Sequence, residues 1–271
     1  MISVIVVTYN SAHLLPAFAA ALHADTQAPP YELILVDNAS HDAPWQHIPD
    51  AQWIRLDQNL GFGTACNRGA AHATGDYLVF MNPDVCVSPG WLIQLQYHLA
   101  THPDVALIAP ETLYPGEQRT LHTGIADRST LPGAALMVSR HHWQQLGGFD
   151  EAIFLYWEDT DLCWRAQSRG YRTVVARDTA VVHQRGGSGG GAHTWLHEYT
   201  KNGLYVHLKL QPWWHICWFV VRQCLAWPLH GARGASPRLW HALWWNWQHR
   251  QRTRQLRTMW RTTISSRSST Y

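Results

Sequence analysis

The feature that most constrains the fold is a series of short apolar runs, each followed by polar residues. Residues 3–8 read SVIVVT and residues 76–81 read DYLVFM, and such nearly continuous runs are typical of strands buried on both faces of a parallel sheet. Segments in which apolar residues recur at helical spacing separate them, as at 13–23, 62–73 and 90–101. The alternation predicts an α/β domain with a mostly parallel central sheet.

Further elements follow the same pattern. We expect strands at 31–36, 53–56, 105–109, 134–139, 173–176 and 180–182, and helices at 140–146 and 158–168. Hydrophobic residues make up 46% of the 271-residue chain and charged residues 15%, so a sizeable core is expected.

The cysteines and the first residues indicate the compartment. The five cysteines are odd in number and no pair has CxxC spacing, which indicates reduced thiols rather than disulfides or a zinc site. The opening residues, MISVIVVTYN, lack the basic segment and the small-residue cleavage site of a signal peptide. We therefore expect a cytoplasmic protein whose chain begins with a strand.

Charge is distributed very unevenly along the chain. Residues 1–200 contain all 19 acidic residues and 10 of the 21 lysines and arginines, a balance of −9, whereas residues 201–271 contain the other 11 and no acid. Nine of the sixteen tryptophans also follow residue 212. Because the two parts differ so strongly, we expect two physical roles. We place an α/β domain at 1–210 and a basic, Trp-rich helical extension at 211–271.

Polar side chains follow three of the expected strands at the point where each strand ends. They are Thr8, Tyr9 and Asn10 after the first, Asp37 and Asn38 after the second, and Asn82, Pro83 and Asp84 after the fourth. In open parallel sheets, ligands bind outside the carboxyl ends of the strands. Any one group is better explained by turn formation, since Asp, Asn and Pro favour turns. Three such groups in one half of a sheet favour a binding site.

A glycine-rich segment at Asn59–Gly69 reads NLGFGTACNRG and suggests a phosphate-binding loop. It departs from the dinucleotide fingerprint GxGxxG, because Cys66 takes the sixth position and the acidic Asp37 precedes the loop. A plain turn before a helix that packs closely on the sheet explains the glycines equally well. On that helix, Asn67 and Arg68 could still reach a nucleotide.

Asp84 and His183 are candidate metal ligands. A carboxylate at a strand end can bind a hard divalent cation that also bridges substrate phosphates. His183 ends the apolar run AVVH and precedes the glycine-rich stretch GGSGGG at 186–191. This stretch is either a loop that closes over a substrate and excludes water, or a surface linker.

Three carboxylates, Glu158, Asp159 and Asp161, stand among aromatic residues in the segment FLYWEDTDLCWRAQSRG at 154–170. Grouped negative charges repel one another, and apolar surroundings raise the free energy needed to ionise them. In the first turn of a helix, the dipole stabilises an acidic side chain by about 0.3–1 kcal/mol, which explains one or two of the three. A carboxylate cluster with aromatic walls also suits a general base that faces a sugar hydroxyl.

Six motifs occur in order: VVTYN, VDNAS, NLGFGxxxNxG, MNPDV, GGFDExxFLYWEDTDLCWR and VVHQRGGS. Together they resemble a bacterial family 2 glycosyltransferase of the rhamnosyltransferase-like group, over residues 1 to about 210. The resemblance implies a Rossmann-like glycosyltransferase-A fold and inverting transfer of a sugar from a nucleotide-diphosphate donor. It favours dTDP-rhamnose, although related enzymes use UDP-linked sugars. It also implies Mg²⁺ or Mn²⁺, and a glycan or lipid-linked saccharide as acceptor in cell-surface polysaccharide synthesis.

The resemblance assigns donor-binding roles to residues at matching positions. Asp37 would contact the base or ribose of the nucleotide. Asn82-Pro83-Asp84 stands where such enzymes carry an Asp-x-Asp metal motif, so Asp84 would be the main protein ligand, with His183 as a second. The nucleotide pocket as a whole would include Thr8, Tyr9, Asn10, Asp37, Asn38, Asn67, Arg68 and Asn82.

The resemblance also assigns catalytic roles. Asp159 would be the base that takes a proton from the acceptor hydroxyl. Glu158 and Asp161 would shape the acceptor pocket and the pKa of that base. The glycine-rich stretch at 186–191 would be the lid that keeps water from hydrolysing the donor.

The extension combines tryptophans with basic residues. The apolar run at 213–229 is too short and too polar for a transmembrane helix, which needs about 20 predominantly apolar residues. Trp favours the membrane interface and Lys and Arg favour anionic lipids, so we expect helices that lie on the inner face of the cytoplasmic membrane. The alternatives are packing on the catalytic domain or a homodimer interface. No nucleic-acid docking motif accompanies the charge, so we expect no nucleic-acid partner.

Two other functions compete with glycosyl transfer. A non-catalytic scaffold that binds nucleotide sugars would explain Asn82 in place of an acid, but it needs no base such as Asp159. A nucleotidyltransferase would usually carry a glycine-rich loop with Arg and Lys directly after the first strand, where this chain reads TYNSAHLLP.

Overall fold

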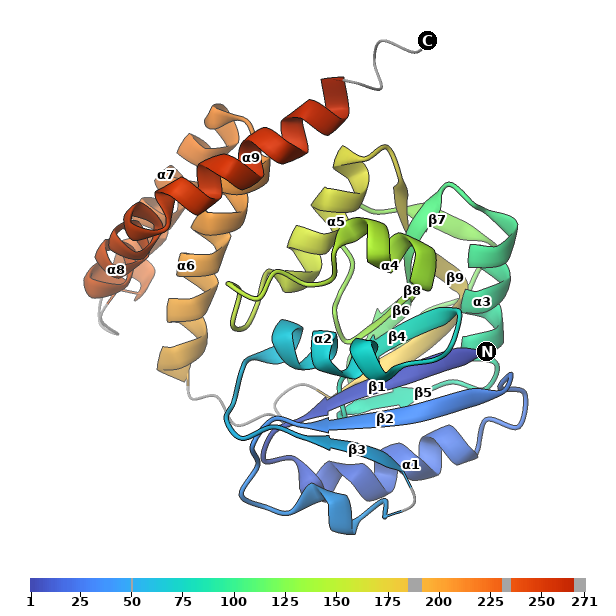
Figure 1. Cartoon of the computed structure of the whole chain (residues 1–271). Helices are drawn as coiled ribbons and strands as arrows, with labels where there is room; N and C mark the ends of the chain where they lie inside the picture. Colours follow the sequence, from blue (N-terminus) through green and yellow to red (C-terminus); the bar gives the residue numbers. More distant parts are fainter. Residues whose placement is uncertain (50, 185–191, 231–234, 266–271) are drawn as a thin grey trace.

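The computed structural model describes residues 1–49, 51–184, 192–230 and 235–265, which form one nine-stranded sheet with helices on both faces and a helical extension (Figure 1). The strands are β1 (Ile2–Thr8), β2 (Tyr31–Asp37), β3 (Gln52–Arg55), β4 (Tyr77–Met81), β5 (Val85–Val87), β6 (Val105–Leu113), β7 (Ile125–Asp127), β8 (Ala135–Ser139) and β9 (Arg172–His183). The helices next to the sheet are α1 (Leu15–His23), α2 (Phe62–His72), α3 (Trp91–Thr101), α4 (Arg140–Leu146) and α5 (Glu158–Ser168).

The sheet has the order β3-β2-β1-β4-β8-β6-β9-β5, and β7 pairs with β9. Strands β3, β2, β1 and β4 are mutually parallel. β8 runs antiparallel to both β4 and β6, β9 is parallel to β6, and β5 and β7 are antiparallel to β9. Six of the nine strands within the described residues therefore point the same way, and the predicted mostly parallel α/β sheet is confirmed.

The apolar strands bury side chains on both faces, because successive residues of a strand point to opposite sides. In β1, Ile5 and Val7 join the hydrophobic cluster beneath α2, α4 and α5, whereas Val4 and Val6 join the cluster beneath α1 and α3. This two-sided burial is the physical reason for the continuous apolar run in the sequence.

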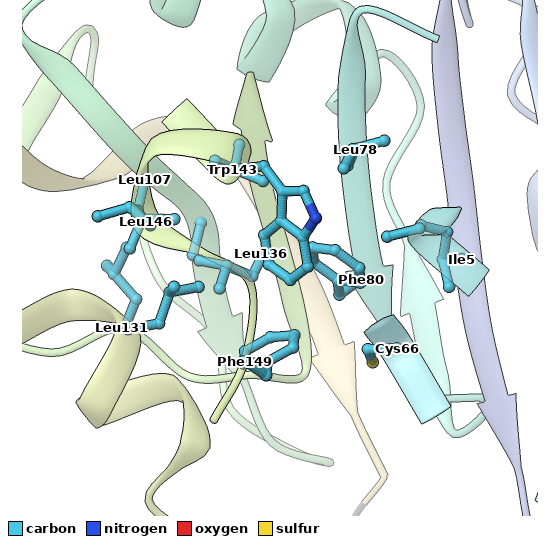
Figure 2. Close-up of a cluster of buried hydrophobic side chains, with 14 of the residues drawn as sticks. Ile5, Cys66, Leu78, Phe80, Leu107, Leu131, Leu136, Trp143, Leu146 and Phe149 are labelled. Carbon is cyan, nitrogen blue, oxygen red and sulfur yellow. The ribbon is translucent and has the colours of Figure 1, made fainter. Parts of the chain in front are cut away.

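An aromatic group fixes α4 and the segment that leads to α5 on the sheet. Figure 2 shows the ring of Phe80, from β4, beside the rings of Trp143 and Phe149, at centroid distances of 4.5 and 5.2 Å. Trp143 and Phe149 also meet edge to face at 5.3 Å. Such pairs contribute about 0.5–1.5 kcal/mol beyond the area they bury.

Some predicted elements differ from those observed. The strands expected at 173–176 and 180–182 are one strand, β9, whose register against β6 shifts between Pro110 and Glu111. The short strands β5 and β7 were not predicted, because three residues are too few to show alternation. The first helix begins at Leu15 after a 3₁₀ turn, with Pro16 in its first turn, where a missing N–H costs nothing.

The predicted helical extension at 211–271 is present as α7 (Trp213–His230), α8 (Ala235–Gln248) and α9 (Arg250–Ser265), and it follows α6 (Ala192–Leu210). α6 packs against α7, α8 and α9, and both α6 and α9 contact α5 (Figure 1). The predicted domain boundary at 210 falls between α6 and α7. Among the helices that the structure describes, none is sufficiently long and apolar to span a membrane.

Candidate active site

The predicted nucleotide pocket begins at the carboxyl ends of β1 and β2. Thr8 is fully buried and stands opposite Asp37 in the parallel register. Asp37 is almost inaccessible, and its Oδ1 accepts a 2.9 Å hydrogen bond from the backbone N–H of Ser40. Its Oδ2 lies 4.0 Å from Nε of Arg55. Asp37 therefore both shapes the turn after β2 and carries charge at the sheet edge.

Tyr9 and Asn10 form the turn after β1. Asn10 has a φ of +50°, in the left-handed region that asparagine adopts more readily than most residues. Its backbone N–H donates to Oγ of Ser40 at 3.0 Å, and its Oδ1 accepts from the N–H of His41 at 2.9 Å. The N–H of Tyr9 donates to Oγ of Ser11. The turns after β1 and β2 are thus joined into one surface.

Asn38 holds the glycine-rich segment against β2. Its Nδ2 donates to Oδ1 of Asn59 at 2.9 Å, and its Oδ1 accepts from the N–H of Leu60 at 2.9 Å. Gly61, with φ of +84°, caps α2, and a Cβ there would lie 2.1 Å from the carbonyl oxygen of Phe154. These glycines allow close packing, which favours the turn-and-helix interpretation of the motif.

Asn67 and Arg68 bond to the segment that leads to α5. Oδ1 of Asn67 accepts from the N–H of Phe149 at 2.9 Å, and its Nδ2 donates to the carbonyl oxygen of Phe149 at 3.0 Å. Nη1 of Arg68 lies 3.4 Å from Oε1 of Glu151. Within the described residues, neither side chain bonds to a strand-end residue of the predicted nucleotide pocket.

Asp84, Asn82 and His183 meet where β5 pairs with β9. Oδ1 of Asp84 lies 3.3 Å from Nε2 of His183, and Nδ2 of Asn82 lies 3.5 Å from the same nitrogen. The Asp84 side chain is 7% exposed, and its Oδ1 has no hydrogen-bond partner. A buried carboxylate oxygen without a donor, beside an imidazole, fits a divalent cation that takes its other ligands from substrate phosphates.

No group of three or more His, Cys, Asp or Glu side chains that could hold a metal ion occurs in the part of the chain that the structure describes. A divalent cation bound at Asp84 and His183 would therefore need further oxygen ligands from a bound substrate. The predicted lid at 186–191 lies outside the described residues.

The three acids occupy the first turn of α5, as predicted, after a turn with unusual backbone geometry. Tyr156 and Trp157 both have positive φ, +65° and +77°, a conformation that costs about 1–3 kcal/mol for each residue that is not glycine. The backbone N–H of Phe62 donates to the carbonyl oxygen of Phe154 at 3.0 Å. Nδ2 of Asn202, on α6, donates to the carbonyl oxygen of Leu155 at 2.8 Å. Contacts from α2 and α6 thus hold the turn.

Glu158 and Asp159 differ in their surroundings. Glu158 is buried, its Oε2 has no hydrogen-bond partner, and burial together with the charges of Asp159 and Asp161 raises its pKa to about 8. Asp159 is partly exposed; its Oδ2 accepts from the N–H of Gly133 at 2.9 Å and its Oδ1 from the N–H of Thr160 at 2.6 Å. Burial raises the pKa of Asp159, and these hydrogen bonds oppose the rise.

Asp161 is inaccessible and paired with two cations. Its Oδ2 accepts from Nε of Arg165 at 2.7 Å and its Oδ1 from Nζ of Lys209 at 2.6 Å. Asp161 therefore binds α5 to α6, and its charge contributes to the raised pKa of Glu158.

A cavity of about 410 Å³ opens beside the first turn of α5. The two carboxylates Glu158 and Asp159 line it together with the aromatic rings of Tyr156 and Trp157. The rest of the lining comes from Thr130, from Thr160 and Trp164 of α5, and from α6 and α7, which contribute Tyr199, His207, Trp218, Phe219, Arg222 and Gln223. The predicted arrangement of a carboxylate pair with aromatic walls is present.

The sequence analysis did not predict that α6 and α7 line this cavity. The only signal was that Arg222 is the lone arginine of the apolar run at 213–229, four residues after Trp218 and so on the same helical face. Which element that face would meet depends on tertiary packing.

Comparison with known proteins decides the family. Residues 3–167, more than half of the chain, match the sequence model of Glycosyl transferase family 2. The chain belongs to this family. The match supports glycosyl transfer over the nucleotidyltransferase alternative.

This glycosyltransferase is similar to curated enzymes along most of its length. It is 26% identical over 285 residues to N-acetylglucosaminyl-diphospho-decaprenol L-rhamnosyltransferase of Mycobacterium tuberculosis, an alignment that covers 86% of this chain and 90% of that relative. It is 29% identical over 203 residues to the uncharacterized glycosyltransferase YwdF of Bacillus subtilis, covering 67% and 73% of the two chains.

Solved structures of similar fold are also glycosyltransferases. One is GalNAc-T7 with UDP, GalNAc and Mn²⁺, at a TM-score of 0.63 and 16% identity, covering 77% of this glycosyltransferase and about half (48%) of that chain. Another is the mannosyltransferase PcManGT from Pyrobaculum calidifontis in complex with GDP-Man and Mn²⁺, at a TM-score of 0.57 and 17% identity, covering 98% and 86%. The predicted glycosyltransferase-A fold is confirmed.

Proposed function

We propose that this glycosyltransferase moves a sugar, with inversion, from a nucleotide-diphosphate donor to a hydroxyl of a glycan or lipid-linked saccharide of the cell surface. The observation that carries the proposal is the cavity that Asp159 shares with aromatic side chains. Asp159 is linked to the end of β4, because it accepts from the N–H of Gly133 and the next residue, Ala134, accepts from the N–H of Asn82. The name of the M. tuberculosis relative supports rhamnose as the sugar, and dTDP is the carrier that the resemblance of the motifs implies. UDP-linked sugars are the alternative donors.

Asp159 is the proposed general base. A base must be ionised before it accepts a proton, and Glu158, with a pKa near 8, keeps its own proton at neutral pH. The N–H groups of Gly133 and Thr160 orient the Asp159 carboxylate and favour its charged form. Asp159 would take the proton of the acceptor hydroxyl while that oxygen attacks the anomeric carbon.

The donor would bind at the carboxyl ends of β1, β2 and β4. Asp37 and the turn of Tyr9 and Asn10 would contact the nucleoside, and Asp84 with His183 would hold Mg²⁺ or Mn²⁺. A cation held there stabilises negative charge on the departing nucleoside diphosphate. The two fold neighbours, GalNAc-T7 and PcManGT, both hold Mn²⁺ together with a nucleotide or nucleotide sugar, which supports this kind of cofactor.

The extension is proposed to rest on the inner face of the cytoplasmic membrane. Trp214 and Trp218 on α7, and Trp240, Trp244 and Trp247 on α8, are 55–71% exposed. On each helix their three- and four-residue spacing places them on one face. Exposed Trp with the arginines of α9 suits adsorption to an anionic surface. Binding to vesicles that contain anionic lipid, and not to neutral vesicles, tests this association.

The test of the proposed function is a panel of nucleotide sugars given to the purified protein with and without Mn²⁺, scored by release of nucleoside diphosphate. Metal-dependent release from one donor identifies a transferase and names its sugar. Binding of a donor without release, even when membrane extract supplies acceptors, would favour the scaffold alternative. Binding of no donor would contradict the assignment of the nucleotide site.

A further inference from the structure

The cavity beside the carboxylates has a wall that the nucleotide site does not use. That wall is the face of α7 that carries Trp218, Phe219 and Arg222. Glu158 and Asp159 line the same cavity, so a molecule that fills it contacts both the proposed base and α7. The volume of about 410 Å³ lies within the range of small-molecule sites.

Packing against the catalytic turn fixes this part of α7. The ring of Phe219 lies 4.4 Å from His207 and 5.9 Å from Trp157, between centroids. Gly203 on α6 makes the approach possible, since a Cβ there would come within 2.7 Å of Phe219 and 2.9 Å of Trp157. The α7 wall is therefore positioned by the same aromatic residue that precedes the carboxylates.

Arg222 brings positive charge to the cavity. Its guanidinium lies 5.7 Å from the ring centroid of Trp218, and no carboxylate pairs with it among the residues that the structure describes. His207 adds little charge at neutral pH, because burial lowers its pKa; the hydrogen bond that its Nδ1 donates to the carbonyl oxygen of Gly203 at 2.8 Å opposes this shift. A guanidinium is well suited to a phosphate group, which it can bind through two parallel hydrogen bonds.

The chemistry of the adjoining surface indicates what carries the phosphate. Trp214 and Trp218, 56% and 62% exposed, lead along α7 from the cavity, with Trp213 beside them at 72%. Amphipathic indole rings of this kind favour the boundary between water and lipid. Along α7, Trp218 lies one turn from Arg222 and Trp214 one turn further, so a cation and a lipid-compatible surface adjoin the cavity that Glu158 and Asp159 also line.

We propose that α7 forms the acceptor subsite and that Arg222 binds the phosphate group joining the acceptor saccharide to its lipid. The inference rests on the proposed function and specifies its acceptor: a sugar held near Asp159, a phosphate at Arg222 and an acyl or prenyl chain along the tryptophans of α7. The extension thereby selects the substrate in addition to contacting the membrane.

The direct test is binding of farnesyl diphosphate, a soluble lipid phosphate, to the full chain with the donor site saturated by nucleoside diphosphate. We expect Arg222→Gln to weaken binding roughly 10- to 100-fold, the size of a lost hydrogen-bonded charge contact. Arg250→Gln is the matched control, because Arg250 is also exposed and lies 4.2 Å from the ring of Trp247, but it does not line the cavity. Farnesol, which lacks the diphosphate, should bind the wild-type protein, Arg222→Gln and Arg250→Gln with equal affinity.

Several outcomes would overturn the inference. Equal loss in both arginine variants would mean that general surface charge attracts the probe, and no loss in Arg222→Gln would remove the phosphate contact. A raised KM for the donor in Arg222→Gln would assign the guanidinium to the donor diphosphate instead. Donor turnover by the wild-type protein is scored separately, so failure of the transferase proposal is distinguishable from failure of this one.

A second pair of variants separates the subsite from membrane adsorption. Trp218→Ala should weaken binding of farnesyl diphosphate, because Trp218 lines the cavity beside Arg222, whereas Trp240→Ala should not, because Trp240 is an exposed tryptophan of α8 outside the cavity lining. Both variants should lower adsorption to anionic vesicles to a similar degree. An equal effect of the two substitutions on farnesyl diphosphate would contradict a subsite on α7.

Discussion

The ammonium group of Lys209 lies 2.6 Å from Oδ1 of Asp161 and 2.8 Å from Oδ2 of Asp150, and all three side chains are at most 6% exposed. Lys209 belongs to α6 and Asp161 to α5, so one buried cation joins α6 to the helix that carries the proposed base. Burial by itself would raise the pKa of Asp150, but Lys209 and the hydroxyl of Tyr205 hold it well below its usual range.

Replacing Lys209 should destabilise the protein strongly. Lys209→Met keeps most of the side-chain volume but leaves two buried carboxylates without their shared cation, which typically costs about 3–5 kcal/mol. The measurement is the free energy of unfolding from urea titration. Arg252→Met is the matched control: Arg252 also pairs with Asp150, at 2.8 Å, but its side chain is 51% exposed, so its loss should cost less than about 1 kcal/mol. Equal losses would contradict the central role of Lys209.

Removing the proposed base should abolish transfer and spare donor binding. Asp159→Asn keeps the size of the side chain but cannot accept the acceptor proton, so we expect kcat to fall about 100- to 10,000-fold. Initial rates and calorimetric donor titration measure the two quantities. Asp127→Asn, at an exposed carboxylate that pairs with Arg172, is a control with no expected effect on kcat. Wild-type transfer by Asp159→Asn would show that another group is the base.

The raised pKa of Glu158 predicts how stability depends on pH. The unfolded chain loses this proton near pH 4.5, whereas the folded chain keeps it up to about pH 8. Between these values the unfolded state binds fewer protons, so the free energy of unfolding falls as pH rises, by at most about 1.4 kcal/mol per pH unit.

The substitution Glu158→Gln removes this titrating group, so comparing the free energy of unfolding of the variant and the wild type at several pH values tests the prediction. Relative to wild type, the variant should gain stability steadily in urea unfolding between about pH 5 and 8. Other titrating groups are common to both proteins and cancel in the difference. A difference that stays constant over this range would mean that Glu158 is ionised in the folded state throughout.

The two ends of β4 offer a matched test of the metal assignment. Asp84 follows the strand and is buried, whereas Asp76 precedes it, is exposed and bonds to the N-terminal ammonium group at 3.1 Å. Loss of even an outer partner of a metal ligand lowers metal affinity about 10- to 100-fold, so Asp84→Ala should weaken Mn²⁺-dependent donor binding at least that much. Asp76→Ala should leave it unchanged, as measured by calorimetry with nucleoside diphosphate. Equal donor affinity in both variants would remove Asp84 from the metal site.

Local sequence determined the sheet and the place of the acids. Strands buried on both faces are continuously apolar, so the apolar runs of the sequence predicted β1 and β4. The polar residues after these strands predicted the edge of the sheet where ligands bind. The acids of α5 were readable as a first helical turn because their spacing and the following Gly170 are local features. The order of the six motifs was sufficient to predict the glycosyltransferase family.

Tertiary structure decided what each of these side chains does. Nothing local distinguishes Asp161, buried between Arg165 and Lys209, from Asp159, which lines the cavity. The difference arises because α6 brings Lys209 against Asp161, whereas Asp159 faces the cavity that α6 and α7 help to line. The positive φ of Tyr156 and Trp157 is likewise sustained by contacts from Phe62 and Asn202, far away in the chain. Sequence periodicity reports which face of a helix is apolar, but the partner of that face is chosen by long-range packing, and so the α7 wall of the cavity was visible only in the folded protein.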